Sequence, residues 1–154
     1  MTAPRFLNFM RAILSCLLLG IAVSCGDQTD PVKDSIDRVA AAAEKRDAAA
    51  VLGQLAETFQ SAEGIGRADV EAQLRRYFAA YENLDVEISE LSIERAERAA
   101  RATFRADLSG KVRKIGGLEG ILPSASAWRF EVRLVPEGDG WKIAWVSYQP
   151  AEGR

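Results

Sequence analysis

The sequence predicts an α+β domain in which three N-terminal helices pack on a curved, bulged antiparallel sheet. Two observations carry this prediction. Apolar residues recur with helical spacing through the first half of the chain, whereas the second half alternates apolar and polar residues as strands do. Helices that precede a run of strands are typical of α+β architecture.

The first predicted helix begins at Pro31, because Asp30 is a good N-cap residue and proline is tolerated at the first helical position. Its inward face comprises Val32, Ile36, Val39, Ala40 and Ala43. Asp47 interrupts this spacing and can cap a second helix. The inward residues of that second helix are Val51, Leu52, Leu55 and Phe59.

After a loop over Ser61–Gly66, a third helix is predicted from Ala68 to Glu82. Asn83 follows as a plausible C-cap, since asparagine tolerates the left-handed conformation. The inward residues of this helix are Val70, Leu74, Tyr77, Phe78 and Tyr81.

Two strands come next. In the first, over Leu84–Ile93, two successive polar residues at Ser89–Glu90 change the phase of the alternation, which predicts a β-bulge and a bend. The second strand runs over Ala100–Leu108 and turns a row of small residues and Phe104 inward.

The segment from residue 126 to residue 148 predicts a β-hairpin, because two alternating runs flank a Gly- and Asp-containing turn. Pairing Leu134 with Ile143 and Val132 with Trp145 places the large apolar side chains on one face. This register makes Trp145 a central core residue.

The N-terminal residues predict an export signal. Arg5 and Arg11 precede a short apolar run, Ala12–Val23. This run has fewer residues than a helix needs to span a bilayer. The sequence Ala22–Cys25 resembles a bacterial lipobox, in which the cysteine receives a diacylglyceryl group and becomes the first mature residue. The position three residues before the lipobox cysteine is usually Leu or Val, and here it is Ala22. A plain secretory signal or an uncleaved anchor, with Cys25 incidental, is the alternative.

The predicted organisation is therefore a lipoprotein signal peptide over residues 1–24, a lipidated Cys25 and tether over 25–31, one domain over 32–150 and a tail over 151–154. We expect a protein of the bacterial cell envelope that faces the periplasm; whether it sits on the inner or the outer membrane is open. Cys16 is removed with the predicted signal peptide, which leaves Cys25 without a second cysteine, so no disulfide is expected.

Composition excludes several function classes. A formal net charge of −2 gives no electrostatic reason to bind nucleic acid. The chain contains no histidine, which removes Ser-His-Asp and Cys-His nucleophile systems and the usual zinc sites. We expect no cofactor and no metal.

Ser109–Ala125 connects the second predicted strand to the hairpin. This segment is long for a loop and rich in aliphatic residues. Such residues would not stay in water as a free loop, so the segment is a candidate lid over the mouth or an edge of the domain. The candidate lid residues are Ile115, Leu118, Ile121 and Leu122.

This order of elements over residues 32–149 resembles the nuclear-transport-factor-2-like (NTF2-like) superfamily, also called SnoaL-like or cystatin-like cone folds. The resemblance is one of layout, without an invariant motif. It implies a sheet curved around helices to form a cone with a pocket at its wide end. The superfamily contains isomerases, cyclases, dehydratases and many non-catalytic domains, so the fold does not choose a function. The candidate pocket residues are Tyr77, Tyr81, Phe104, Trp128 and Trp145.

We expect a non-catalytic role, the binding of a small apolar ligand or of an envelope partner, and assign no catalytic residue. The alternative is a small SnoaL-like isomerase or hydratase that uses a tyrosine and carboxylate pair in the cone. Against it, Asp85, Glu87 and Asp107 are out of phase with the apolar residues and should face water.

The outer sheet face is predicted to carry several cations. These are either solvated and paired across strands, or they form a docking surface for an acidic partner or a second copy of the chain. The residues are Arg101, Arg105, Arg129, Arg133 and Lys142.

Replacement of the lipobox cysteine tests the anchor. Cys25→Ser should remove the lipid mass and release the protein from the membrane fraction, because several acyl chains on one residue anchor a protein far better than one. Intact-mass analysis and fractionation measure both effects. Unchanged membrane association would contradict the lipobox interpretation.

Overall fold

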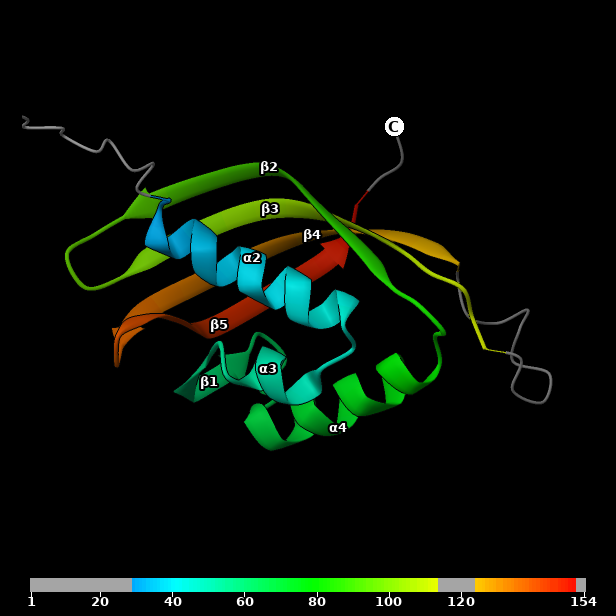
Figure 1. The fold of residues 1–154 in the computed structure, drawn as a ribbon. Coiled ribbons are helices and arrows are strands. Elements are labelled where there is room, and N and C mark those ends of the chain that lie inside the picture. The colour runs from blue at the N-terminus through cyan, green and yellow to red at the C-terminus, as the bar shows by residue number, and fades with distance from the viewer. Residues whose placement is uncertain (1–28, 114–123, 152–154) are drawn as a thin grey trace, which may run out of the picture.

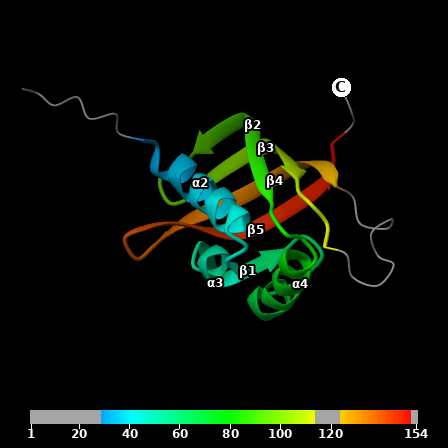
Figure 2. The same cartoon turned by 45° about the vertical axis from the view of Figure 1, so that its right-hand side comes forward.

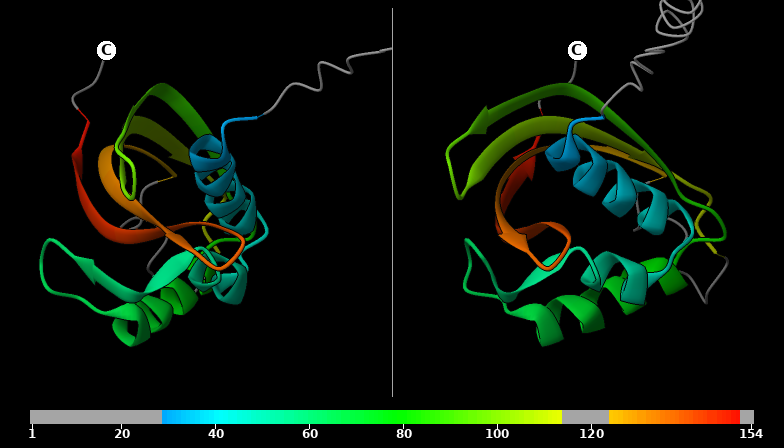
Figure 3. Two further views of the ribbon diagram at one scale, coloured as in Figure 1. Left: turned by 90° about the vertical axis from the view of Figure 1, so that its left-hand side faces the viewer. Right: turned by 60° about the vertical axis from the view of Figure 1, so that its left-hand side comes forward.

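The computed structural model describes residues 29–113 and 124–151. A five-stranded sheet in the order β1-β5-β4-β3-β2 curves around the helices (Figure 1). Figure 3 shows the sheet wrapping around α2 while α4 runs beside β1. The predicted α+β class and curved sheet are confirmed, although the sheet is mixed and not wholly antiparallel, because β1 pairs with β5 in parallel.

Helix α2 (Pro31–Glu44) begins where the sequence predicts. The Asp30 side chain accepts hydrogen bonds from the backbone N–H groups of Val32 (2.8 Å) and Lys33 (3.2 Å), so it satisfies donors that the first turn leaves unpaired. Val32 and Ile36 are buried on the inward face.

No helix in the described part of the chain has the length and apolarity needed to cross a membrane.

The second helix is shorter than predicted. Asp47 does cap α3 (Ala48–Leu52), accepting from the Ala50 N–H at 2.9 Å. The chain then enters β1 (Leu55–Ser61), so Leu55 and Phe59 lie on a strand and their assignment to a helix is wrong. Residues four apart share a face in both a helix and a strand, so spacing alone could not separate the two.

Helix α4 (Arg67–Ala79) ends three residues earlier than predicted. Tyr81 leaves the helix and forms a β-bridge with Val112. Asn83 is not the C-cap, because Ala80 takes that position and the Asn83 side chain accepts from the Lys111 N–H at 2.9 Å. Figure 2 shows α4 lying apart from the strands that α2 covers.

Strands β2 (Asp85–Arg95) and β3 (Ala100–Ser109) form an antiparallel pair. The predicted bulge is confirmed, since the register shifts between Ser89 and Ser92 and Glu90 has a φ of 53°. On β3 the inward side chains are buried, and they are Ala100, Ala102, Phe104 and Ala106.

The closing hairpin comprises β4 (Ala125–Glu137) and β5 (Gly140–Pro150), and only part of its predicted register is correct. Leu134 pairs with Ile143 as predicted. A bulge after this pair leaves Ala144 without a partner, so Trp145 pairs with Arg133 and not with Val132. An extra residue reverses the sidedness of everything beyond it.

Trp145 consequently lies on the outer face, and its assignment to the core is wrong. The Arg133 guanidinium carbon lies 4.4 Å from the centroid of the Trp145 ring, which is a cation–π geometry. Val132 pairs with Val146 in the place predicted for Trp145. The inner face therefore carries Val146 and Tyr148 beyond the bulge.

Two substitutions test this register. Leu134 is fully buried, so Leu134→Ala should lower the free energy of unfolding by about 2–5 kcal/mol. Trp145→Ala should lower it by less, because Trp145 stacks on an exposed arginine outside the core. Urea denaturation measures both. A larger loss for Trp145→Ala than for Leu134→Ala would contradict the observed register.

Candidate functional site

An apolar cavity of about 460 Å³ lies between the helices and the inner face of the sheet. The helices supply aliphatic lining, which comprises Ile36, Val39, Ala40, Ala43, Val51, Val70 and Leu74. The sheet supplies an aromatic wall made of Phe104, Trp128, Phe130 and Tyr148. Alternation places these four side chains on one face, because each is paired with or two residues from another inward residue.

The aromatic wall is closely packed. The Phe104 and Phe130 rings stack with centroids 5.3 Å apart and planes 16° apart. Tyr148 meets Trp128 edge to face at 5.8 Å and lies 5.9 Å from Phe130. These are favourable aromatic arrangements. Since Tyr148 is 44% exposed, this end of the wall reaches solvent.

No side chain with a formal charge lines the cavity among the described residues. Its polar groups are Ser61, Gln73, Tyr77, Trp128 and Tyr148. Ser61 is buried, whereas Gln73 is exposed. The cavity thus combines a large apolar surface with a few hydrogen-bonding groups, as ligand pockets commonly do.

Tyr77 and Tyr81 form a tyrosine pair at one end of the cavity, with ring centroids 4.9 Å apart. Burial, reinforced by a hydrogen bond with Tyr81, raises the pKa of Tyr77 to about 12, and a hydrogen bond with Ser126 acts in the opposite direction. Trp128 Nε1 donates to Ser126 Oγ at 3.1 Å. Tyr77 is therefore a neutral phenol at physiological pH and a poor acid.

The structure brings together three of the five residues suggested as pocket residues. Tyr77, Phe104 and Trp128 line the cavity. Tyr81 is buried behind Tyr77 and does not line it, and Trp145 lies on the outer face because of the bulge in β5. The candidate lid residues Ile115, Leu118, Ile121 and Leu122 lie outside the described residues.

Sequence reasoning missed two members of the aromatic wall. Phe130 follows the same alternation as Trp128 and could have been found from it. Tyr148 could not, because its side depends on the extra residue in β5.

No protein-family model and no curated protein matches the sequence. Solved structures do match. An NTF2-like superfamily protein from Salmonella enterica superposes with a TM-score of 0.63 at 18% identity, covering 79% of this chain and 89% of that one. A candidate dehydratase of the NTF2-like family from Streptomyces avermitilis gives 0.66 at 13%, covering 80% and 96%.

The Bdellovibrio bacteriovorus protein Bd1075 matches with a TM-score of 0.64 at 13% identity. The match covers 78% of this chain but only 40% of Bd1075. At such identities the likeness concerns the fold. The chain has the NTF2-like fold.

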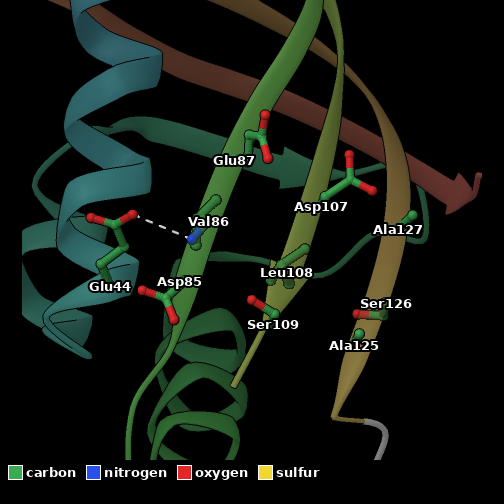
Figure 4. A pocket seen from close by; sticks show the side chains of 10 residues that line it. All are labelled: Glu44, Asp85, Val86, Glu87, Asp107, Leu108, Ser109, Ala125, Ser126 and Ala127. Atoms are coloured by element: carbon green, nitrogen blue, oxygen red, sulfur yellow. Dashed lines mark hydrogen bonds between the residues drawn. The ribbon is translucent and has the colours of Figure 1, made fainter. Parts of the chain in front are cut away.

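Several carboxylates of the domain gather outside the apolar cavity. Figure 4 shows a second hollow, of about 430 Å³, beside β2, β3 and β4, lined by Glu44, Asp85, Glu87 and Asp107. Glu44 accepts from the Val86 N–H at 3.3 Å. Asp107 pairs with Arg105 at 2.8 Å. In the described parts of the chain, no three Cys, Asp or Glu side chains are placed to hold a metal ion.

The outer sheet face of the domain pairs several of its charges. Arg101 bonds both carboxylate oxygens of Glu131 at 2.9 Å, and Arg129 bonds Glu90 at 2.8 Å. The hydrogen bond from Arg101 holds the pKa of Glu131 below its usual value. Lys142 donates to the backbone carbonyl of Gly53. Of the five predicted cations, Arg101 and Arg129 thus form cross-strand ion pairs, Arg105 pairs with Asp107 on its own strand, and Arg133 stacks on Trp145. Exposed ion pairs contribute little stability.

The raised pKa of Tyr77 predicts a pH effect on stability. The phenol stays protonated in the folded state up to about pH 12, whereas the unfolded state loses the proton near pH 10, so stability falls as pH rises between these values. Tyr77→Phe should remove this contribution. Urea denaturation of both proteins from pH 9 to pH 12 measures the difference.

The stability advantage of the parent over Tyr77→Phe should therefore shrink with rising pH. Tyr148→Phe is a matched control for the loss of a phenol at the solvent-facing end of the cavity. An advantage that grows with pH would contradict the assignment.

Proposed function

We propose that this protein binds a small, uncharged, apolar molecule in the cavity between its helices and sheet, without transforming it. The observation that carries the proposal is the lining itself: aliphatic helices, an aromatic wall and, among the described residues, no charged side chain. Pockets for small ligands are mostly apolar and occupy a few hundred cubic ångströms.

The energetics favour an apolar ligand. Each square ångström of apolar surface removed from water contributes about 25 cal/mol, so a bicyclic hydrocarbon-sized molecule gains several kcal/mol on burial. A charged ligand would lose its hydration and meet no opposite charge among the described lining residues.

An isomerase or dehydratase is the competing function, because two proteins of similar fold are named as candidate dehydratases. Such chemistry needs an acid and a base within reach of the substrate. Asp85, Glu87 and Asp107 line the neighbouring hollow, which shares Val86 and Leu108 with the cavity, and none of the three lines the cavity itself. The chain has no histidine. Tyr77, the partly buried phenol at the cavity, has a raised pKa and no carboxylate beside it in the described lining. Binding is thus favoured over catalysis.

We place the domain at a membrane of the cell envelope, facing the periplasm, through lipid on Cys25. The tether Gly26–Asp30 has five residues, which reach at most roughly 18 Å when extended. A domain held this close to a bilayer would stay near a reservoir of apolar molecules. An envelope partner or a second copy at the outer sheet face remains compatible with this placement.

Filling the cavity tests the proposed function. Ala40→Phe introduces a ring where Ala40 lines the cavity and should weaken binding of the neutral dye N-phenyl-1-naphthylamine by about tenfold, the equivalent of about 1.4 kcal/mol. The matched control is Ala41→Phe, because Ala41 is the exposed neighbour on the same helix. Fluorescence titration measures both affinities, and circular dichroism checks the fold. No saturable dye binding by the parent, or equal weakening in both variants, would contradict the proposal.

A further inference from the structure

Ser61 is a buried polar residue in the wall of the apolar cavity. It is the last residue of β1, and its side chain lies on the same face as the core residue Phe59, two positions earlier. Only 6% of Ser61 is exposed, and it lines the cavity. A buried hydroxyl group normally has hydrogen-bond partners, so each of its donor and acceptor sites should be assigned one.

The lone pairs of Ser61 are occupied, but its proton is not. Ser61 Oγ accepts from the backbone N–H groups of Glu63 and Ile65, each at 3.1 Å, and so organises the turn into α4. A serine hydroxyl has two acceptor sites and one donor. In the described part of the chain, no acceptor is bonded to that donor.

The other polar groups of the cavity differ from Ser61 in this respect. The Tyr77 hydroxyl already has hydrogen bonds with Tyr81 and Ser126. The Trp128 Nε1–H group already donates a hydrogen bond to Ser126 Oγ. Gln73 and Tyr148 are exposed and can bond water. Ser61 is therefore the buried lining residue whose donor is left for a ligand.

We propose that the Ser61 hydroxyl is the polar subsite of this cavity and donates a hydrogen bond to a ligand acceptor. The ligand class is then an uncharged apolar molecule that carries a carbonyl or ether oxygen. The inference rests on the proposed binding function. The proposed subsite excludes carboxylates as good ligands, because the described lining supplies one buried neutral donor without an acceptor and no cation to offset the loss of hydration.

Three ligands of nearly one shape test the subsite. They are 2-ethylnaphthalene, which has no acceptor, 2-acetylnaphthalene, which has a carbonyl, and 2-naphthoate, which is charged. Dissociation constants come from displacement of the neutral dye by each ligand from the parent and from Ser61→Ala. Loss of the hydrogen bond should raise the acetyl-to-ethyl ratio of dissociation constants about three- to tenfold in Ser61→Ala. Dividing by the ethyl value cancels general damage to the cavity.

Two further measurements keep the test decisive if Ser61→Ala unfolds. Ser61→Cys keeps an acceptor for the turn amides but donates only weakly, so it should raise the same ratio. In the parent, the carbonyl stretch of bound 2-acetylnaphthalene should shift to lower frequency than in hexane. An unshifted carbonyl would overturn the subsite.

The outcomes separate the two proposals. If neither naphthalene displaces the dye and the dye itself does not bind saturably, the binding function fails. If both bind but the ratio is the same in the parent and in the Ser61 variants, the function stands and the Ser61 subsite is wrong. If 2-naphthoate binds as tightly as 2-acetylnaphthalene, the restriction to uncharged ligands is wrong.

Discussion

One extra residue in β5 determines the inner surface of this domain. Ala144 has no partner in β4, so the strand changes sidedness between Ile143 and Trp145. Before the bulge, Leu134 and Ile143 close the core; beyond it, Val146 and Tyr148 face inward and Trp145 faces out. Without the bulge, Tyr148 would lie outside and the aromatic wall would lose one member. Trp145 in turn finds a partner in Arg133 on the outer face.

The cavity follows from where small and large side chains fall on that surface. Helix α2 contacts β2 and β5. Strand β3, which lies between them in the sheet, turns mostly alanines inward, whereas the rings of Phe104 and Phe130 build up the wall. Helix α4 contacts β1 and α3, so it covers the other flank. The space between the two flanks is lined on one side by aliphatic helix residues and on the other by aromatic sheet residues, and a flat apolar molecule would contact both.

Charge is divided between the two faces of the sheet. The described cavity lining is neutral, while on the outer face Arg101 and Arg129 are joined to carboxylates across strands. The acidic hollow beside β2 and β3 adjoins the cavity at Val86 and Leu108, its carboxylates do not line the cavity, and its Asp107 forms an ion pair with Arg105. Within a neutral, apolar cavity each unpaired hydrogen-bonding group carries more weight than it would at the surface, since water cannot replace a missing partner. This is why a single serine hydroxyl can select a ligand class.

The sequence by itself determined the features that depend on neighbouring residues. The caps at Asp30 and Asp47, the bulge in β2, the inward row of β3 and the Leu134–Ile143 pair all follow from local chemistry and short-range alternation. The α+β class and the resemblance to NTF2-like folds follow from the order of these elements, and Tyr77, Phe104 and Trp128 do line the cavity. Only the tertiary structure decided the rest. Leu55 and Phe59 form a strand because β5 offers a parallel partner far away in sequence, and spacing by four fits either helix or strand. Trp145 and Tyr148 exchange sides because sidedness beyond a bulge depends on the partner strand, which a single run of residues does not contain.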